Sequence, residues 1–241
     1  MPSRLSNIVD FAYDRLRDKI NGGRTVVANE ASLQLQLSAI LKTVGELFET
    51  HANERFSIEL EKPVYLDIGF KKSGTSKAKI DIFLALENTT TREKECCAIE
   101  LKFFKRENHR EPNNRYDIFK DIQNLEVYGA DVGYLIVATD HPHYVNQDRY
   151  SPDTGGFDVR HDHRYEVGTE LIYQTEKPYG PPIRLRNSYH FLWHEFAGGS
   201  HFLKLEVLPE PNAMSPVLGA QLPPAPKRKE ADRPVRESQM C

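Results

Sequence analysis

Two apolar segments on either side of a short polar turn constrain the fold of this chain more than any other feature. Residues 79–86 and 96–104 are rich in branched and aromatic side chains, and the polar stretch 88–94 separates them. Apolar runs joined in this way are typical of a β-hairpin. Glu100 and Lys102 interrupt the otherwise apolar second run. Burying a charged side chain costs free energy, so we expect Glu100 and Lys102 to have a functional role.

The expected hairpin brings three charged side chains together. Residues two apart on a strand share a face, so Glu100 and Lys102 point the same way. With the turn centred between Thr90 and Arg92, Asp81 falls opposite residues 100–102, and opposed residues also share a face. We expect the other face to pack into a core through Ile80, Ile82, Leu84, Leu86, Ile99, Leu101 and Phe103.

Two carboxylates beside an amine favour metal-assisted phosphodiester chemistry. Neighbouring carboxylates repel each other unless a cation lies between them, and hard oxygen ligands suit Mg²⁺ or Mn²⁺. Such an ion can stabilise a leaving oxygen and acidify a bound water, which Lys102 could orient or deprotonate. The alternative is that Asp81, Glu100 and Lys102 are solvated positions or cross-strand ion pairs, as charged residues on strands usually are.

The remaining periodicity predicts an α/β protein. A helix over 3–20 ends at Asn21, Gly22 and Gly23, and a second helix begins after an Asn29 N-cap. A helix over 115–128 followed by the apolar strand 132–138 predicts a β-α-β crossover. The segment 140–168 is polar and predicts a long loop with a short helix. The further expected elements are a helix over 30–50 and strands over 56–60, 64–70, 170–174, 189–196 and 202–208.

The spacing of the charged trio resembles the PD-(D/E)XK nuclease superfamily, also called restriction-endonuclease-like. Asp81 is followed nineteen residues later by Glu100-Leu101-Lys102, and the order of elements over residues 28–140 is similar to the core of that superfamily. The resemblance implies a mixed β-sheet flanked by helices, with extra strands at the C-terminal side. This sequence departs from the pattern in having Ile80 where a proline often stands before the first acid.

The resemblance also implies roles for individual residues. Asp81 and Glu100 would bind the metal together with the carbonyl of Leu101, and Lys102 would act at the attacking water. Glu30 matches a glutamate on the preceding helix that often joins the site, although a carboxylate there also stabilises the start of a helix. The Q-x-x-x-Y feature of exonuclease-like branches is absent because Gln123 and Tyr128 are five residues apart.

Basic and amide side chains near the trio predict contacts with a phosphate backbone. Gln34 lies one helical turn after Glu30, and it could face the same site. A solvated loop and helix face would explain the remaining residues equally well. The candidate nucleic-acid-binding residues are Gln34, Lys105, Arg106, Arg115, Lys120 and Gln123.

Composition sets the wider limits. The 241 residues carry a net charge of −3, so a nucleic acid would need a local basic surface. We expect a nuclease-like domain over 1–208 and a disordered, proline-rich tail over 209–241. Cys96 and Cys97 would point to opposite faces of one strand, without a disulfide. With no apolar signal core and no membrane-spanning run, we expect a cytoplasmic protein that binds no membrane.

The sequence thus predicts a magnesium- or manganese-dependent nuclease, and the resemblance implies an endonuclease that acts on DNA. The resemblance places such a protein in prokaryotic defence or in mobile-element DNA processing, and it allows a homodimer. Two alternatives stay open: an RNA endonuclease, and a catalytically silent nuclease fold that binds or regulates. The paired histidines, such as His141 with His143 and His161 with His163, are more typical of solvated loops than of a zinc site.

Overall fold

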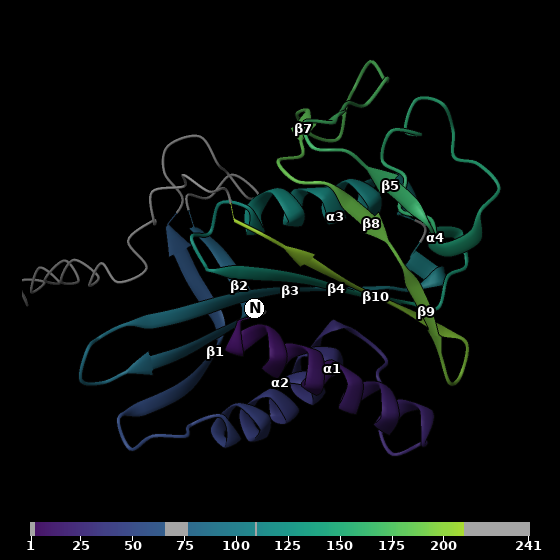
Figure 1. The fold of residues 1–241 in the computed structure, drawn as a ribbon. Helices are drawn as coiled ribbons and strands as arrows, with labels where there is room; N and C mark the ends of the chain where they lie inside the picture. The colour runs from purple at the N-terminus through teal and green to yellow at the C-terminus, as the bar shows by residue number, and fades with distance from the viewer. Residues whose placement is uncertain (1–2, 66–76, 109, 210–241) are drawn as a thin grey trace, which may run out of the picture.

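A six-stranded mixed β-sheet with helices on both faces organises the chain in the computed structural model, which describes residues 3–65, 77–108 and 110–209. Helices α1 (Arg4–Asn21) and α2 (Glu30–Leu47) cover one face, and α3 (Glu111–Leu125) covers the other (Figure 1). This arrangement confirms the expected α/β class. From one edge to the other, the strands are β1 (Glu54–Tyr65), β2 (Lys77–Asn88), β3 (Lys94–Phe104), β4 (Val132–Thr139), β10 (Ser200–Val207) and β9 (Trp193–Phe196).

The first two helices begin within one residue of the expected positions because their starts are capped, whereas α2 ends at Leu47 rather than at residue 50. The Ser3 side chain accepts a hydrogen bond from the amide of Ser6 at the start of α1. At the start of α2, Asn29 and Ser32 form a reciprocal capping box. Each helix buries one apolar stripe against the sheet, and the fully buried positions include Leu5, Leu16, Leu33 and Leu37. The apolar periodicity therefore predicted both helices correctly.

The antiparallel half of the sheet differs from expectation in one strand. Residues 54–65 form the single strand β1, whereas the sequence predicted separate strands over 56–60 and 64–70. β1 passes through the gap between those two segments with Glu61 at a φ of 53°, in the left-handed region. A strand can absorb one such residue without ending. Residues 66–70 lie outside the described part of the chain.

A parallel crossover joins the two halves of the sheet. β3 leads through α3 into β4, and the register pairs Glu100 with Leu135 and Lys102 with Val137. All eight residues of β4 are buried, as expected for a strand that is covered on both faces. α3 starts at Glu111 rather than near 115, with Pro112 in its first turn, where a missing amide costs nothing.

The C-terminal segments form a layer over α3 and complete the sheet. β10 pairs antiparallel with β4, and β9 forms the edge. The expected strands over 170–174 and 189–196 are shorter in the structure, since β6 ends at Leu171 and Leu192 separates β8 from β9. The remaining elements are η1 (Arg106–Asn108), α4 (His143–Asn146), β5 (His163–Tyr165), β6 (Glu170–Leu171), β7 (Ile183–Arg184) and β8 (Tyr189–Phe191).

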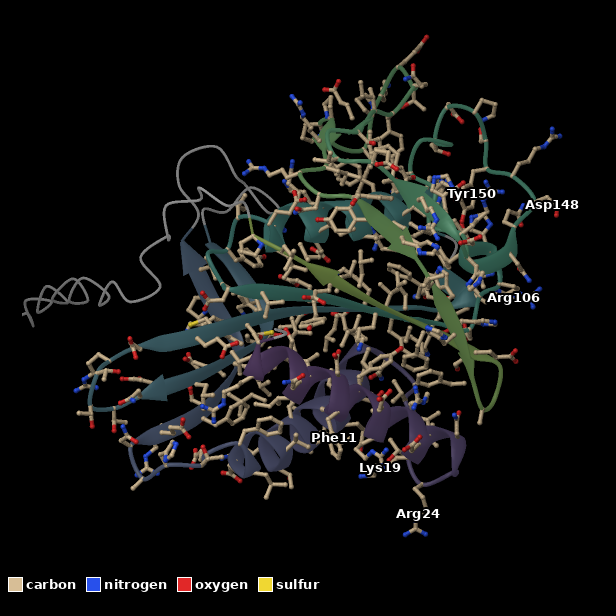
Figure 2. The ribbon with its side chains drawn as sticks, in the orientation of Figure 1. Phe11, Lys19, Arg24, Arg106, Asp148 and Tyr150 are labelled. Carbon is tan, nitrogen blue, oxygen red and sulfur yellow. The ribbon has the colours of Figure 1, made fainter. Side chains whose placement is uncertain are left out.

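Side chains fill two hydrophobic cores, one on each face of the sheet (Figure 2). Cys96 belongs to the core beneath α3, and Cys97 belongs to the core beneath α1 and α2. Both thiols are free and buried, which confirms that the adjacent cysteines point to opposite faces without a disulfide. Burial raises the pKa of both thiols.

The tail predicted over 209–241 lies, apart from Pro209, outside the described residues, as does Cys241. Within the described ranges, none of the helices combines the length and the apolar character that crossing a bilayer requires.

Candidate active site

Asp81 lies where β2 separates from β3. Backbone pairing between these strands runs from Glu87–Lys94 to Ile82–Ile99. One residue beyond the last pair, the Oδ2 atom of Asp81 accepts a 2.7 Å hydrogen bond from the amide of Leu101. A side chain therefore replaces the backbone acceptor that a continuous ladder would have supplied. The carboxylate is held against the backbone of the E-x-K segment, 100–102.

The alternation of β2 breaks at the same residue. Ile82 packs in the core beneath α1 and α2, but Ile80 packs in the core beneath α3. The expectation that Ile80 shares a face with Ile82 is therefore wrong. The physical reason lies in the neighbouring strand, where Glu61 adopts its positive φ between the pairs Leu60–Ile82 and Lys62–Ile80. Asp81 occupies the irregular position between those pairs.

Glu100 is completely buried on the α3 side of the sheet. Its Oε1 atom accepts a 2.8 Å hydrogen bond from the hydroxyl of Tyr128, in the turn after α3. Burial raises the pKa of Tyr128, and the nearby charge of Glu100 raises it further. Tyr128 thus remains a hydrogen-bond donor at neutral pH, and it holds the Glu100 carboxylate in one orientation.

Lys102 also points toward α3, where it meets a second carboxylate. Its Nζ atom lies 2.6 Å from Oδ2 of Asp121, and it donates a 3.2 Å hydrogen bond to the carbonyl of Leu101. Burial by itself lowers the pKa of the Lys102 amine, but Asp121 and Glu100 outweigh it and hold this pKa above its ordinary range. The amine is therefore a fixed positive charge between carboxylates.

Helix α2 contributes a second contact to Asp81. The Nε2 atom of Gln34 donates a 2.8 Å hydrogen bond to the backbone carbonyl of Asp81 and a 3.3 Å hydrogen bond to Oε1 of Glu61. Glu30, one turn earlier, is exposed at the first residue of the helix. Its charge is one of those that raise the pKa of Lys102, so Glu30 lies on the side of α2 that faces the trio.

The structure brings Asp81, Glu100, Leu101 and Lys102 together and sets Gln34 and Glu30 beside them. The donor set that they offer a cation is two carboxylates and one backbone carbonyl. In the described ranges, no group of three or more His, Cys, Asp or Glu side chains forms a ready metal cluster. Mg²⁺ is commonly held by one or two carboxylates, with water and phosphate oxygens filling the other positions. The residues present fit that kind of site.

The candidate nucleic-acid-binding residues divide into two groups. Lys105 and Arg106 follow β3 directly, and both line a hollow with Glu107 and Asp140. On α3, the Lys120 amine donates a 2.8 Å hydrogen bond to Oε1 of Gln123. These four residues are exposed or half-buried.

Arg115 lies elsewhere. It is 2% exposed, and its guanidinium donates to the carbonyls of Thr154 and Phe157 and stacks 3.7 Å from the ring centre of Tyr150. Tyr150 is labelled in Figure 2, within the layer that covers α3. This placement gives Arg115 no surface for a phosphate, so we assign it a structural role in anchoring the 150–157 segment.

Sequence reasoning missed Asp121 and Tyr128 as partners of the trio. On this helix it named Arg115, Lys120 and Gln123, although Asp117, Asp121 and Asn124 follow one another at spacings of four and three. Such a spacing places polar residues on one helical face. Asp121 and Asn124 are 2% and 1% exposed, so this polar stripe points inward. A polar stripe beside an apolar one was the signal available in the sequence.

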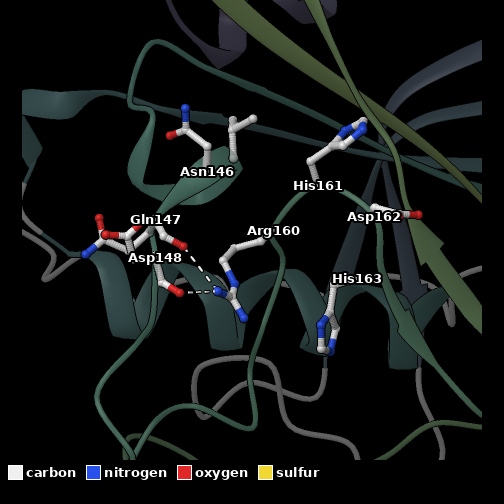
Figure 3. A pocket seen from close by; sticks show the side chains of 8 residues that line it. Asn146, Gln147, Asp148, Arg160, His161, Asp162 and His163 are labelled. Atoms are coloured by element: carbon white, nitrogen blue, oxygen red, sulfur yellow. Dashed lines mark hydrogen bonds between the residues drawn. The ribbon is translucent and has the colours of Figure 1, made fainter.

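The paired histidines have structural roles. His161 and His163 line a polar hollow with Arg160, whose guanidinium donates to the carbonyls of Gln147 and Asp148 (Figure 3). The Nδ1 atom of His161 accepts a hydrogen bond from the amide of Trp193. His163 lies 3.4 Å from the carboxylate of Asp158. His161 and His163 therefore both have partners within the protein.

Comparison of the chain with protein-family models, with curated proteins and with solved structures finds no match. Any functional conclusion therefore depends on the geometry of the site itself.

Proposed function

We propose that this protein is a metal-dependent endonuclease that hydrolyses phosphodiester bonds on a restriction-endonuclease-like fold. One observation carries the proposal: a carboxylate and an amine meet at the backbone of the same residue. Asp81 accepts from the amide of Leu101, and Lys102 donates to its carbonyl. Since Glu100 precedes Leu101 and is completely buried, two carboxylates and an ammonium surround the backbone of one residue.

The ligands proposed for a Mg²⁺ or Mn²⁺ ion are Asp81, Glu100 and the carbonyl of Leu101, and Glu30, on the side of α2 that faces them, would assist. A bound ion of this kind stabilises negative charge on the phosphate and lowers the pKa of a water molecule. Two carboxylates held close together on fixed strands repel each other, and this repulsion favours binding of a cation. Tyr128 keeps Glu100 in place, and the Leu101 amide keeps Asp81 in place.

Lys102 would act on the attacking water or on a phosphate oxygen. Its ion pair with Asp121 maintains it as an ammonium, which donates hydrogen bonds. We therefore propose that Lys102 orients the water and stabilises negative charge, rather than removing a proton. In this proposal Lys105 and Arg106, which follow β3 directly, would contact the phosphate backbone beside the cleaved bond.

DNA as the substrate, a role in prokaryotic defence or mobile-element processing, a homodimeric state and a cytoplasmic location all remain part of this proposal through the resemblance alone. RNA is the alternative substrate. A silent binding module is the alternative of another class, and one observation favours it. Glu100 and Lys102 already have partners in Tyr128 and Asp121, so these two contacts form without a metal.

The decisive experiment compares wild-type protein with Asp81→Ala and Lys102→Ala on supercoiled DNA, single-stranded DNA and RNA, with and without Mg²⁺ or Mn²⁺. We expect metal-dependent cleavage that both substitutions abolish. Lys42→Ala is the matched control, because Lys42 is an exposed lysine on α2 that pairs with Glu46. Absence of cleavage on every substrate, with no metal binding in calorimetry, would contradict the proposal.

A further inference from the structure

Asp121 is a buried carboxylate on α3, and apolar core residues lie beside it on the same helix. Ile118, Phe119 and Ile122 pack in the core beneath α3, and none of them needs an acid nearby. Asp121 is itself 2% exposed. A carboxylate withdrawn from water to this degree costs free energy unless a specific partner compensates. Its presence at this position therefore calls for an explanation in terms of that partner.

The partner is the amine of Lys102, at 2.6 Å from Oδ2 of Asp121. The same amine reaches the carbonyl of Leu101 at 3.2 Å. These two contacts fix the end of a four-carbon side chain that would otherwise sample many rotamers. The lysine side chain is 18% exposed, so the ion pair is not completely sealed from solvent. Asp121 thus holds the Lys102 amine from the α3 side.

A purely structural ion pair between α3 and β3 is the competing explanation. Buried ion pairs contribute little net stability compared with apolar pairs of similar volume, so docking of α3 alone gives weak grounds for retaining one. The ion pair lies at the E-x-K segment, because Lys102 is the last residue of that segment. Its location therefore favours a role in the chemistry of that segment.

We propose that Asp121 is a positioning residue for Lys102, which holds the amine at the Leu101 carbonyl so that it is aimed at the attacking water or the phosphate. The inference rests on the proposed nuclease function. It assigns to α3 a part in the active site, since the helix supplies the second member of the pair. The closing experiment separates failure of this inference from failure of the proposed function.

The test compares Asp121→Asn with Asp117→Asn under steady-state conditions with Mg²⁺. Asp117 lies one helical turn earlier on α3, and its substitution removes the same charge without removing a direct contact with Lys102. Substitution of a residue that orients a catalytic group typically costs about 10- to 100-fold in activity. We expect Asp121→Asn to lower kcat by about 10- to 100-fold with little change in KM. Asp121→Glu, which keeps a carboxylate, should retain part of the kcat that Asp121→Asn loses. Asp117→Asn should stay within about threefold of wild type.

A second readout does not depend on catalysis. Acetylation of lysines, followed by mass spectrometry, reports how strongly each amine is shielded. Lys102 should react faster in Asp121→Asn than in wild type, whereas exposed Lys79 should react equally in both proteins. If wild-type protein cuts no substrate, the proposed function fails, and this comparison still tests the contact with Asp121: equal labelling of Lys102 in the two proteins overturns the inference.

A third measurement covers the case in which Asp121→Asn does not fold. In a nitrogen-15 lysine spectrum of wild-type protein, the Lys102 ammonium can be assigned by its absence in Lys102→Met. A held amine gives a sharp signal that exchanges slowly with water. An ammonium that exchanges as fast as that of Lys79 would overturn the inference. So would an Asp121→Asn protein that folds, turns over and labels like wild type.

Discussion

The hydroxyl of Tyr128 donates a 2.8 Å hydrogen bond to Oε1 of Glu100, and both residues are completely buried. Tyr128→Phe removes this donor and keeps the ring. A hydrogen bond to a buried charged group contributes about 1.5–3 kcal/mol, so we expect the unfolding free energy to fall by about that amount in metal-free buffer. Urea denaturation measures the change.

Tyr13→Phe is the control for that measurement. Tyr13 is also buried, but its hydroxyl has no hydrogen-bond partner among the described residues. Its substitution should therefore leave the unfolding free energy unchanged or slightly higher. Equal losses in the two variants would show that the contact with Glu100 contributes nothing specific.

Asp81 should separate catalysis from folding. Asp81→Asn keeps an oxygen that can accept from the amide of Leu101, whereas Asp81→Ala leaves that amide without its acceptor. An orphaned donor costs about 1–3 kcal/mol, so we expect only the alanine variant to lose that much stability. Both variants should lose at least about 100-fold in metal-dependent cleavage, because a direct ligand matters more than an outer one. Thermal unfolding and plasmid cleavage check the two halves of this prediction.

Arg115 should matter to stability alone. Arg115→Met removes the donors to two buried carbonyls, those of Thr154 and Phe157, and should lower the unfolding free energy by about 3 kcal/mol. Arg106→Met is the exposed counterpart, which should change stability by less than about 0.5 kcal/mol. For nucleic-acid affinity we expect the reverse. Arg106→Met should bind more weakly than wild type and with a smaller salt dependence, and Arg115→Met should bind like wild type. If a folded Arg115→Met protein bound nucleic acid more weakly than wild type, this result would support the phosphate contact first predicted for Arg115.

Glu54 should make stability depend on pH. The hydrogen bond from Arg4, reinforced by the Thr50 and His51 amides, lowers the pKa of Glu54 to about 2 in the folded chain. A depressed carboxyl pKa stabilises the fold above the unfolded value of about 4.3, and this contribution disappears as the pH falls toward 2. The melting temperature of Glu54→Gln should therefore lie below that of wild type at pH 7, and the two should converge near pH 2. A constant difference across this range would exclude the ionised contact as its cause.

The sequence predicted the elements around the site better than their connections within it. Regular alternation in residues 96–104 was sufficient to place Glu100 and Lys102 on one face, because β3 is a continuous strand. The same rule failed for Ile80, since the positive φ of Glu61 breaks the pattern in the paired strands. No local pattern predicts a residue of one strand that disturbs its neighbour.

Partners on other elements were harder to predict for a different reason. Asp121 reaches Lys102 only through the packing of α3 on β3, which the spacing of either segment does not contain. Arg115 was misassigned because a basic residue near a charged motif resembles a surface contact. Its burial depends on the 150–157 segment folding back over α3, a long-range event.

The hydrogen bond between Asp81 and the amide of Leu101 has a consequence for comparing future homologues with this chain. The acid at position 81 accepts from the sheet backbone as well as belonging to the proposed site, so a homologue without the proposed cleavage would still need an acceptor there. An aspartate or asparagine at this position would then persist for structural reasons alone. Position 102 is the more informative marker, because β3 keeps its backbone ladder whatever side chain stands there. Loss of the lysine, together with its acidic partner on α3, would distinguish silent descendants from active ones.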